Sequence, residues 1–168
     1  MTVANLYHPV MGSAVARSVW MKRLFVLLVI AVSLAAVDLW VKLAVPTPPW
    51  ALHQRSDVWF FGSLVLMFAA MPLARLPSTT VTIGAGIFNG GMLGNLISAS
   101  NDHLEVPNPI LIGHQTAGIA FNMADAFILT GNLILMVSLC VLTIRYRDLL
   151  PKRQGFRLTR SSRPRASA

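Results

Sequence analysis

The chain has 168 residues, of which 55% are hydrophobic and only 12% are charged, and its formal net charge is +8. A soluble domain of this size carries roughly twice that charged fraction, and the apolar residues here form long runs rather than periodic stripes. Composition therefore excludes an ordinary soluble domain and predicts an all-α integral membrane protein with one helical bundle.

Four transmembrane helices are expected in chain order. They cover about residues 24–45, 58–74, 80–100 and 119–144; the second is short, and the third is rich in glycine and mildly polar. Of the 14 Lys and Arg residues, only Lys42 and Arg55 fall on the side of the membrane opposite to the rest. Because Lys and Arg are enriched in cytoplasmic loops, both termini are expected inside the cell.

Three segments follow from this pattern. Residues 1–21 are expected to be a disordered extension or an incorrectly assigned start, because Met21 offers a second initiation point. Residues 22–147 form the membrane domain, and residues 148–168 form a basic cytoplasmic tail. A basic tail beside a span usually contacts anionic lipid, so the expected partner is the bilayer and not nucleic acid.

Cysteine and histidine usage predicts neither a disulfide framework nor a cofactor. Cys140 is the single cysteine and lies in the fourth span. Asp102, His103, Glu105 and His114 occur in the outer loop without a recognised ligand spacing. We therefore expect no metal site there and regard these residues as solvated.

Polar residues inside the apolar runs are the candidates for chemistry. Asp38, Asn95, Asn122 and Asp125 all fall in one layer, about 5–10 Å below the outer surface at the helical rise per residue. An intramembrane carboxyl costs about 3 kcal/mol on insertion scales, so Asp125 is a functional candidate. The residues alone leave three roles open for it: a proton-relay acid, an ion ligand or half of an acid/base pair.

Asp38 and Lys42 are four residues apart with the acid first, which is the favourable order for a helical ion pair. One interpretation is a self-neutralising pair that lets the first span insert. The other is that the pair braces a substrate-facing pocket.

Gly86, Gly90 and Gly94 recur every four residues in the third span. Small residues at this spacing let a neighbouring helix approach closely, so packing is the first interpretation. A small transport or channel subunit is a further alternative, in which this face joins copies of the chain and Asp125 is a proton or cation site.

Three motifs together resemble those of a known family. Asp38-x-x-x-Lys42 is similar to the motif Asp-Gln-x-x-Lys. Residues 90–97 (Gly-Gly-Met-Leu-Gly-Asn-Leu-Ile) are similar to Gly-Gly-Ala-x-Gly-Asn-x-x-Asp-Arg. Residues 121–125 (Phe-Asn-Met-Ala-Asp) are similar to Phe-Asn-x-Ala-Asp. In this order they resemble signal peptidase II, the prolipoprotein signal peptidases of bacterial inner membranes. The resemblance covers about residues 22–147.

This resemblance implies a function and a set of site residues. The family uses two aspartates near the outer leaflet to cleave a signal peptide before a lipid-modified cysteine, one carboxylate activating water and the other polarising the carbonyl. By resemblance, Asp125 is a catalytic acid/base. Asn95 and Asn122 position the substrate, and Asp38 and Lys42 support the pocket.

The chain departs from the family pattern in two places. Ser98-Ala99 stands where the motif has Asp-Arg, and residues 46–57 replace an outer segment with an Asn-x-Gly-x-Ala-Phe motif. Asp102, one helical turn beyond Ser98, is the tentative substitute partner of Asp125. Two interpretations stay open: an aspartic endopeptidase acting on diacylglyceryl prolipoproteins, or a non-catalytic scaffold (a pseudoenzyme) that binds lipoprotein precursors or other single-span peptides.

Overall fold

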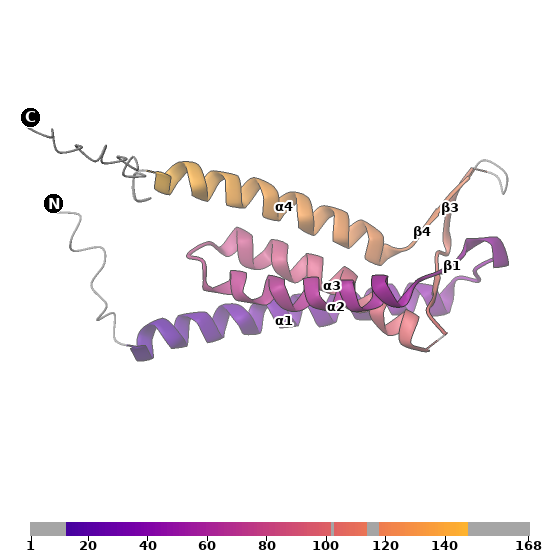
Figure 1. Cartoon of the computed structure of the whole chain (residues 1–168), viewed down its shortest axis with the longest axis horizontal. Helices are drawn as coiled ribbons and strands as arrows, with labels where there is room; N and C mark the ends of the chain where they lie inside the picture. The colour runs from indigo at the N-terminus through magenta and orange to yellow at the C-terminus, as the bar shows by residue number, and fades with distance from the viewer. Residues whose placement is uncertain (1–12, 102, 114–117, 148–168) are drawn as a thin grey trace, which may run out of the picture.

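The computed structural model describes residues 13–101, 103–113 and 118–147. Four helices, two short 3-10 helices and four short strands follow one another as α1 (Ser13–Ala44), η2 (Pro49–Ala51), β1 (Leu52–Gln54), α2 (Asp57–Ala70), η3 (Met71–Arg75), α3 (Thr79–Asn101), β2 (Glu105–Pro107), β3 (Ile110–Ile112), β4 (Ile119–Phe121) and α4 (Met123–Tyr146). The helices run alongside one another, and the strands lie at the end of the bundle opposite to the start of α1 and the end of α4 (Figure 1).

The described part of the chain is mostly helical, as predicted, but it is not purely α-helical. β1 pairs antiparallel with β2, with Leu52 opposite Pro107, and β3 pairs antiparallel with β4, with Ile110 opposite Phe121. The first sheet joins the segment before α2 to the segment after α3. Of the four loop residues expected to be solvated, His103 is exposed and Glu105 is half-buried, while Asp102 and His114 lie outside the described residues. Val106, next to Glu105 in β2, is fully buried.

The prediction that the fourth span begins at residue 119 is wrong. Residues Ile119–Phe121 form β4, and α4 begins at Met123. Asn122 is in an extended conformation, and its side chain accepts a hydrogen bond from Asp125 N at 2.9 Å. Asn is among the strongest N-cap residues because its side-chain oxygen satisfies an N–H group that the first turn leaves free. The cap therefore decides where the helix starts.

The second span is built from two elements. Ser56 caps α2 by accepting a hydrogen bond from Trp59 N at 3.2 Å, and the α-helix ends at Ala70. The chain then continues as η3, with Pro72 in its first turn, because proline has no N–H to extend the α-helical pattern.

Within the described residues, three helical segments are long and apolar enough to cross a membrane: Arg17–Ala44, Asp57–Arg75 and Met123–Tyr146. α3 is not among them, since glycine, asparagine, serine and threonine lower its hydropathy. It is instead the most enclosed helix, packed mainly between α1 and α4 and also touching α2. A polar, glycine-rich helix suits this central place because its neighbours shield it.

The glycine stripe of α3 faces α1 of the same chain, which confirms the packing interpretation. A Cβ on Gly86 would lie 3.0 Å from Ile30, and one on Gly90 would lie 2.8 Å from Leu34. On the α4 side, a Cβ on Gly91 would meet the backbone of Ala124. The channel hypothesis requires this face to join a second copy of the chain. Because α1 of the same chain covers the stripe, the face is not free to do so.

Candidate functional site

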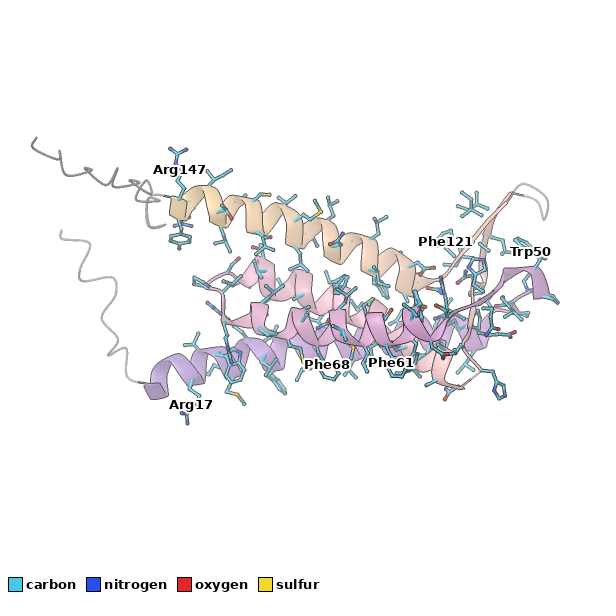
Figure 2. All side chains as sticks on the ribbon, viewed as in Figure 1. Arg17, Trp50, Phe61, Phe68, Phe121 and Arg147 are labelled. Carbon is cyan, nitrogen blue, oxygen red and sulfur yellow. The ribbon has the colours of Figure 1, made fainter. Side chains whose placement is uncertain are left out.

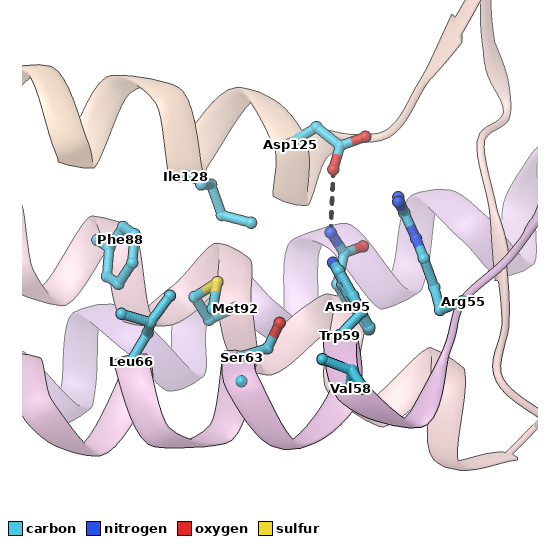
Figure 3. A pocket seen from close by; sticks show the side chains of 11 residues that line it. Arg55, Val58, Trp59, Ser63, Leu66, Phe88, Met92, Asn95, Asp125 and Ile128 are labelled. Carbon is cyan, nitrogen blue, oxygen red and sulfur yellow. Dashed lines mark hydrogen bonds between the residues drawn. The ribbon is translucent and has the colours of Figure 1, made fainter.

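A pocket of about 430 Å³ opens among α2, α3 and α4 near the strand end of the bundle (Figure 3). Its lining is mostly apolar with a few polar groups, and consists of Arg55, Val58, Trp59, Gly62, Ser63, Leu66, Phe88, Met92, Asn95, Asp125 and Ile128. Mostly apolar walls with a small number of polar groups are typical of small-molecule and lipid sites.

Asp125 reaches this pocket from the first turn of α4. Its Oδ1 accepts a hydrogen bond from Asn95 Nδ2 at 3.0 Å (Figure 3), and its Oδ2 accepts a long one, 3.4 Å, from the backbone N of Asn122. The second bond completes a capping box. A carboxylate is favoured at a helix N-terminus by the helix dipole. Asp125 is half-buried, so one side of its carboxyl group still faces the pocket.

Asn122 is fully buried and does not line the pocket. Its Nδ2 donates to Asn108 Oδ1 at 2.6 Å and to Pro107 O at 3.2 Å, while its Oδ1 caps α4. Its donors and side-chain oxygen are therefore already engaged. The structure places Asn122 as the residue that anchors the start of α4, and hence Asp125, to the loop before it.

Asp38 and Lys42 lie behind the pocket wall. Asp38 is fully buried; its Oδ2 is 2.6 Å from Lys42 Nζ, and its Oδ1 accepts a hydrogen bond from Ala124 N at 2.8 Å. The bond to Ala124 satisfies another free N–H of the first turn of α4. Asp38 thus ties α1 to α4, and its carboxylate is occupied on both oxygens.

Lys42 connects this buried ion pair to Asp125. Its Nζ donates to Asn95 Oδ1 at 2.9 Å and to Ser98 Oγ at 3.1 Å, in addition to the contact with Asp38. An ammonium group only donates, so Asn95 must turn its oxygen toward Lys42 and its NH2 toward Asp125. Lys42 therefore sets the orientation in which Asn95 donates to Asp125.

Ser98 occupies the position at which the resemblance expects an aspartate. It is buried, accepts the hydrogen bond from Lys42 and donates to Gly94 O at 3.0 Å. A Cβ on Gly94 would lie 2.6 Å from Asp38 Oδ2, so glycine is required for Asp38 to pack here. Ser98 does not line the pocket. Asp102, the tentative substitute partner, lies outside the described residues.

Two lining residues were not singled out by the sequence analysis. Arg55 precedes α2, its Cζ lies 4.9 Å from the centre of the Trp59 ring, and its side chain extends toward Asp125 (Figure 3). Ser63 on α2 is 6% exposed and has no hydrogen-bond partner for its hydroxyl within the described residues. The one sequence signal for Arg55 was its position as one of two cations on the outer side.

An open apolar groove on the outer face of α2 borders the pocket. This groove, about 650 Å³, is lined by Asp57, Val58, Phe61, Gly62, Val65 and Leu66. Val58, Gly62 and Leu66 line both spaces. Nothing lies within 4 Å of a Cβ placed on Gly62, so there is open space at this glycine, which borders both the pocket and the groove. The arrangement allows an apolar chain to reach Asp125 from the side of the bundle.

Comparison with protein-family models, with curated proteins and with solved structures finds no match to this chain. Among the described residues, no three His, Cys, Asp or Glu side chains gather as a metal site.

Proposed function

We propose that this chain is a signal-peptidase-II-like protein of a bacterial inner membrane, and that its pocket binds the signal-peptide region of a diacylglyceryl-modified prolipoprotein. The proposal includes four spans with both termini in the cytoplasm. Three helices satisfy the length and composition of a span, and α3 is shielded between them. The positive charges at the start of α1, in η3 and at the end of α4 support this orientation.

A single observation carries the binding proposal: the carboxyl group of Asp125 stands at the wall of a mostly apolar pocket that shares Val58, Gly62 and Leu66 with an open apolar groove. A single-span peptide or its acyl chains would occupy the apolar part. The peptide backbone at the end of such a segment needs hydrogen-bond partners in the absence of water. Arg55, Ser63, Asn95 and Asp125 provide donors and acceptors at that depth.

Hydrolysis requires a second acid near Asp125, and the described residues do not provide one at the pocket. Asp38 is bound to Lys42 and Ala124, and Ser98 has replaced the expected aspartate. Loss of one member of a catalytic pair usually costs several orders of magnitude in rate. The geometry therefore favours binding of the precursor without efficient cleavage.

Cleavage is the second candidate function, and it rests on the place of Asp102 in the sequence, one helical turn beyond Ser98. Asp102 follows Asn101, the last residue of α3, in the sequence, and itself lies outside the described residues. If its carboxyl group meets Asp125, the pair could share a proton and act as acid and base. In that case the same pocket would support endopeptidase activity.

The test uses purified protein in lipid nanodiscs with a diacylglyceryl-modified prolipoprotein, measuring binding and loss of the signal peptide separately. Wild type should bind the precursor and leave it intact, and Asp125→Asn should still bind. Gly62→Phe should reduce binding strongly, because the open space at Gly62 accepts a ring that fills the pocket. Gly62→Ala and Asp57→Asn are the matched controls and should bind as wild type does.

Two outcomes distinguish the candidates. If wild type cleaves, and Asp125→Asn and Asp102→Asn both stop cleavage while Asp57→Asn does not, the peptidase function replaces the binding function. If wild type is inert and Ser98→Asp gains cleavage, the missing carboxyl group alone separates this chain from catalysis. Failure of wild type to bind the precursor would refute both.

A further inference from the structure

A second pocket lies at the opposite end of the bundle from Asp125. It has a volume of about 330 Å³, and it is formed by the turn before α3, the first turn of α3 and the last turns of α4. Its lining residues are Pro77, Ser78, Thr80, Val137, Ser138, Val141, Leu142, Arg145 and Tyr146. The function proposed above makes no use of this space.

Arg145 places a positive charge at the mouth of this second pocket. The side chain is exposed, and its Cζ lies 5.9 Å from the centre of the Tyr146 ring. In the described part of the chain it has no acidic partner. Hydroxyl groups of Ser78 and Thr80, 2.8 Å apart, stand across from it at the start of α3. Ser78 Oγ also accepts a hydrogen bond from Val81 N at 3.3 Å, and the remaining N–H groups at the start of a helix favour an anion.

Ser138 gives a second, independent indication of a ligand. It is 9% exposed and lines the second pocket, yet its hydroxyl has no hydrogen-bond partner within residues 13–101, 103–113 and 118–147. Helical hydroxyls commonly bond back to the carbonyl four residues earlier. Thr143 on the same helix does so, to Leu139 O at 2.8 Å. The unused hydroxyl of Ser138 instead faces the pocket.

These groups are spaced for a phospholipid. Ser138 and Arg145 are seven residues apart on one face of α4, which is about 10 Å along the helix axis. Val137 and Val141, each 56% exposed, continue the site as an apolar surface on the side facing lipid. From the bundle end inward, α4 therefore presents the cation of Arg145, then the apolar Val141, and then the buried hydroxyl of Ser138 with Val137 beside it.

We propose that this second pocket binds one anionic phospholipid. Its phosphate lies between Arg145 and the start of α3, its glycerol passes Val141, the Ser138 hydroxyl donates to an ester carbonyl, and an acyl chain continues inward past Val137. The positive charge, which has no acidic partner among the described residues, selects an anionic lipid over a zwitterionic one. Basic pockets between membrane helices are known to bind lipid headgroups at the cytoplasmic side.

The test is native mass spectrometry of the full chain titrated with phosphatidylglycerol, with phosphatidylcholine, and with inorganic phosphate alone. We expect one retained phosphatidylglycerol, weaker retention of phosphatidylcholine, and no retention of phosphate. Arg145→Gln should weaken retention of phosphatidylglycerol about fivefold, the effect of one cation at a membrane surface. Ser138→Ala should weaken retention of both lipids.

Matched controls separate a built site from general attraction. Lys22→Gln removes an exposed cation from α1, and Ser33→Ala removes an exposed hydroxyl, both outside this pocket. Neither should change retention. The proposal is overturned if Lys22→Gln weakens binding as much as Arg145→Gln, if Ser138→Ala has no effect, or if inorganic phosphate binds as tightly as the lipid. Circular dichroism checks that each variant is folded.

Discussion

At the scale of single residues, the site is organised by a buried chain of polar contacts that runs from Asp38 through Lys42 and Asn95 to Asp125. Each contact is between 2.6 and 3.0 Å, and the first two residues are almost completely inaccessible. Buried charges are tolerated when they are paired and hydrogen-bonded. The ion pair is therefore a structural support that also orients Asn95 toward the pocket.

Lys42→Met should strongly destabilise the protein, because it leaves the carboxylate of Asp38 buried and unpaired. Breaking a buried pair in this way costs about 3–5 kcal/mol. The double variant Asp38→Asn/Lys42→Met should recover most of that loss, because an asparagine oxygen still accepts from Ala124 N. Unfolding free energies in mixed micelles measure both. A double variant as unstable as Lys42→Met would show that the bonds to Asn95 and Ser98 matter more than the ion pair.

At the scale of elements, α3 is the helix that brings the polar residues together. Its glycines allow both neighbours to approach closely, with Gly90 against α1 and Gly91 against α4. α4 in turn starts at the Asn122 cap, which places Asp125 beside Asn95. The hydrogen bond between Asn95 Nδ2 and Asp125 Oδ1 therefore depends on the close packing of α3 against α4.

Gly91→Ala should destabilise the bundle by about 1–3 kcal/mol, as other overpacked cores are destabilised. The added Cβ meets the backbone of Ala124 and Ile128, which cannot move without shifting α4. The control is Gly62→Ala, where nothing lies within 4 Å and alanine is the better helix former. Thermal unfolding in detergent compares the two, and equal melting temperatures would contradict the close approach of α3 and α4.

At the scale of the whole molecule, both apolar surface and charge are distributed for a membrane. Large exposed apolar side chains cover α1, α2 and α4, including Phe25, Trp40, Val58, Phe61 and Leu129. All side chains are drawn in Figure 2, where the labelled Arg17 and Arg147 lie at the end of the bundle opposite to Trp50 and Phe121. This separation agrees with one end facing the cytoplasm.

Cysteine labelling tests whether α3 crosses the membrane as the other three helices are expected to do. In a Cys140→Ala background, Thr79→Cys and Asn101→Cys place a thiol at each exposed end of α3. An impermeant maleimide applied to intact spheroplasts should label position 101, and should label position 79 only after the membrane is opened. Cys140→Ala alone should remain unlabelled. Labelling of both positions from the same side would show that α3 does not cross the membrane.

Some features of this protein follow from the sequence because they depend on composition and local chemistry. Long apolar runs are enough to predict α1, α2 and α4, and the i, i+4 spacing of Asp38 and Lys42 predicts their ion pair. A carboxyl group in an apolar run identifies Asp125 as a candidate wherever its partners lie. The four-residue spacing of glycines in α3 likewise predicts a packed face.

Other features were decided only by the tertiary structure, because they depend on which side chains meet across separate elements. The sequence assigned residues 119–121 to a helix, whereas strand pairing with β3 and the Asn122 cap place the start of α4 at Met123. It did not predict that Lys42 would bond Ser98, or that Arg55 would face Asp125. Hydrogen bonds between residues more than 50 positions apart have no local signature, so only folding determines them.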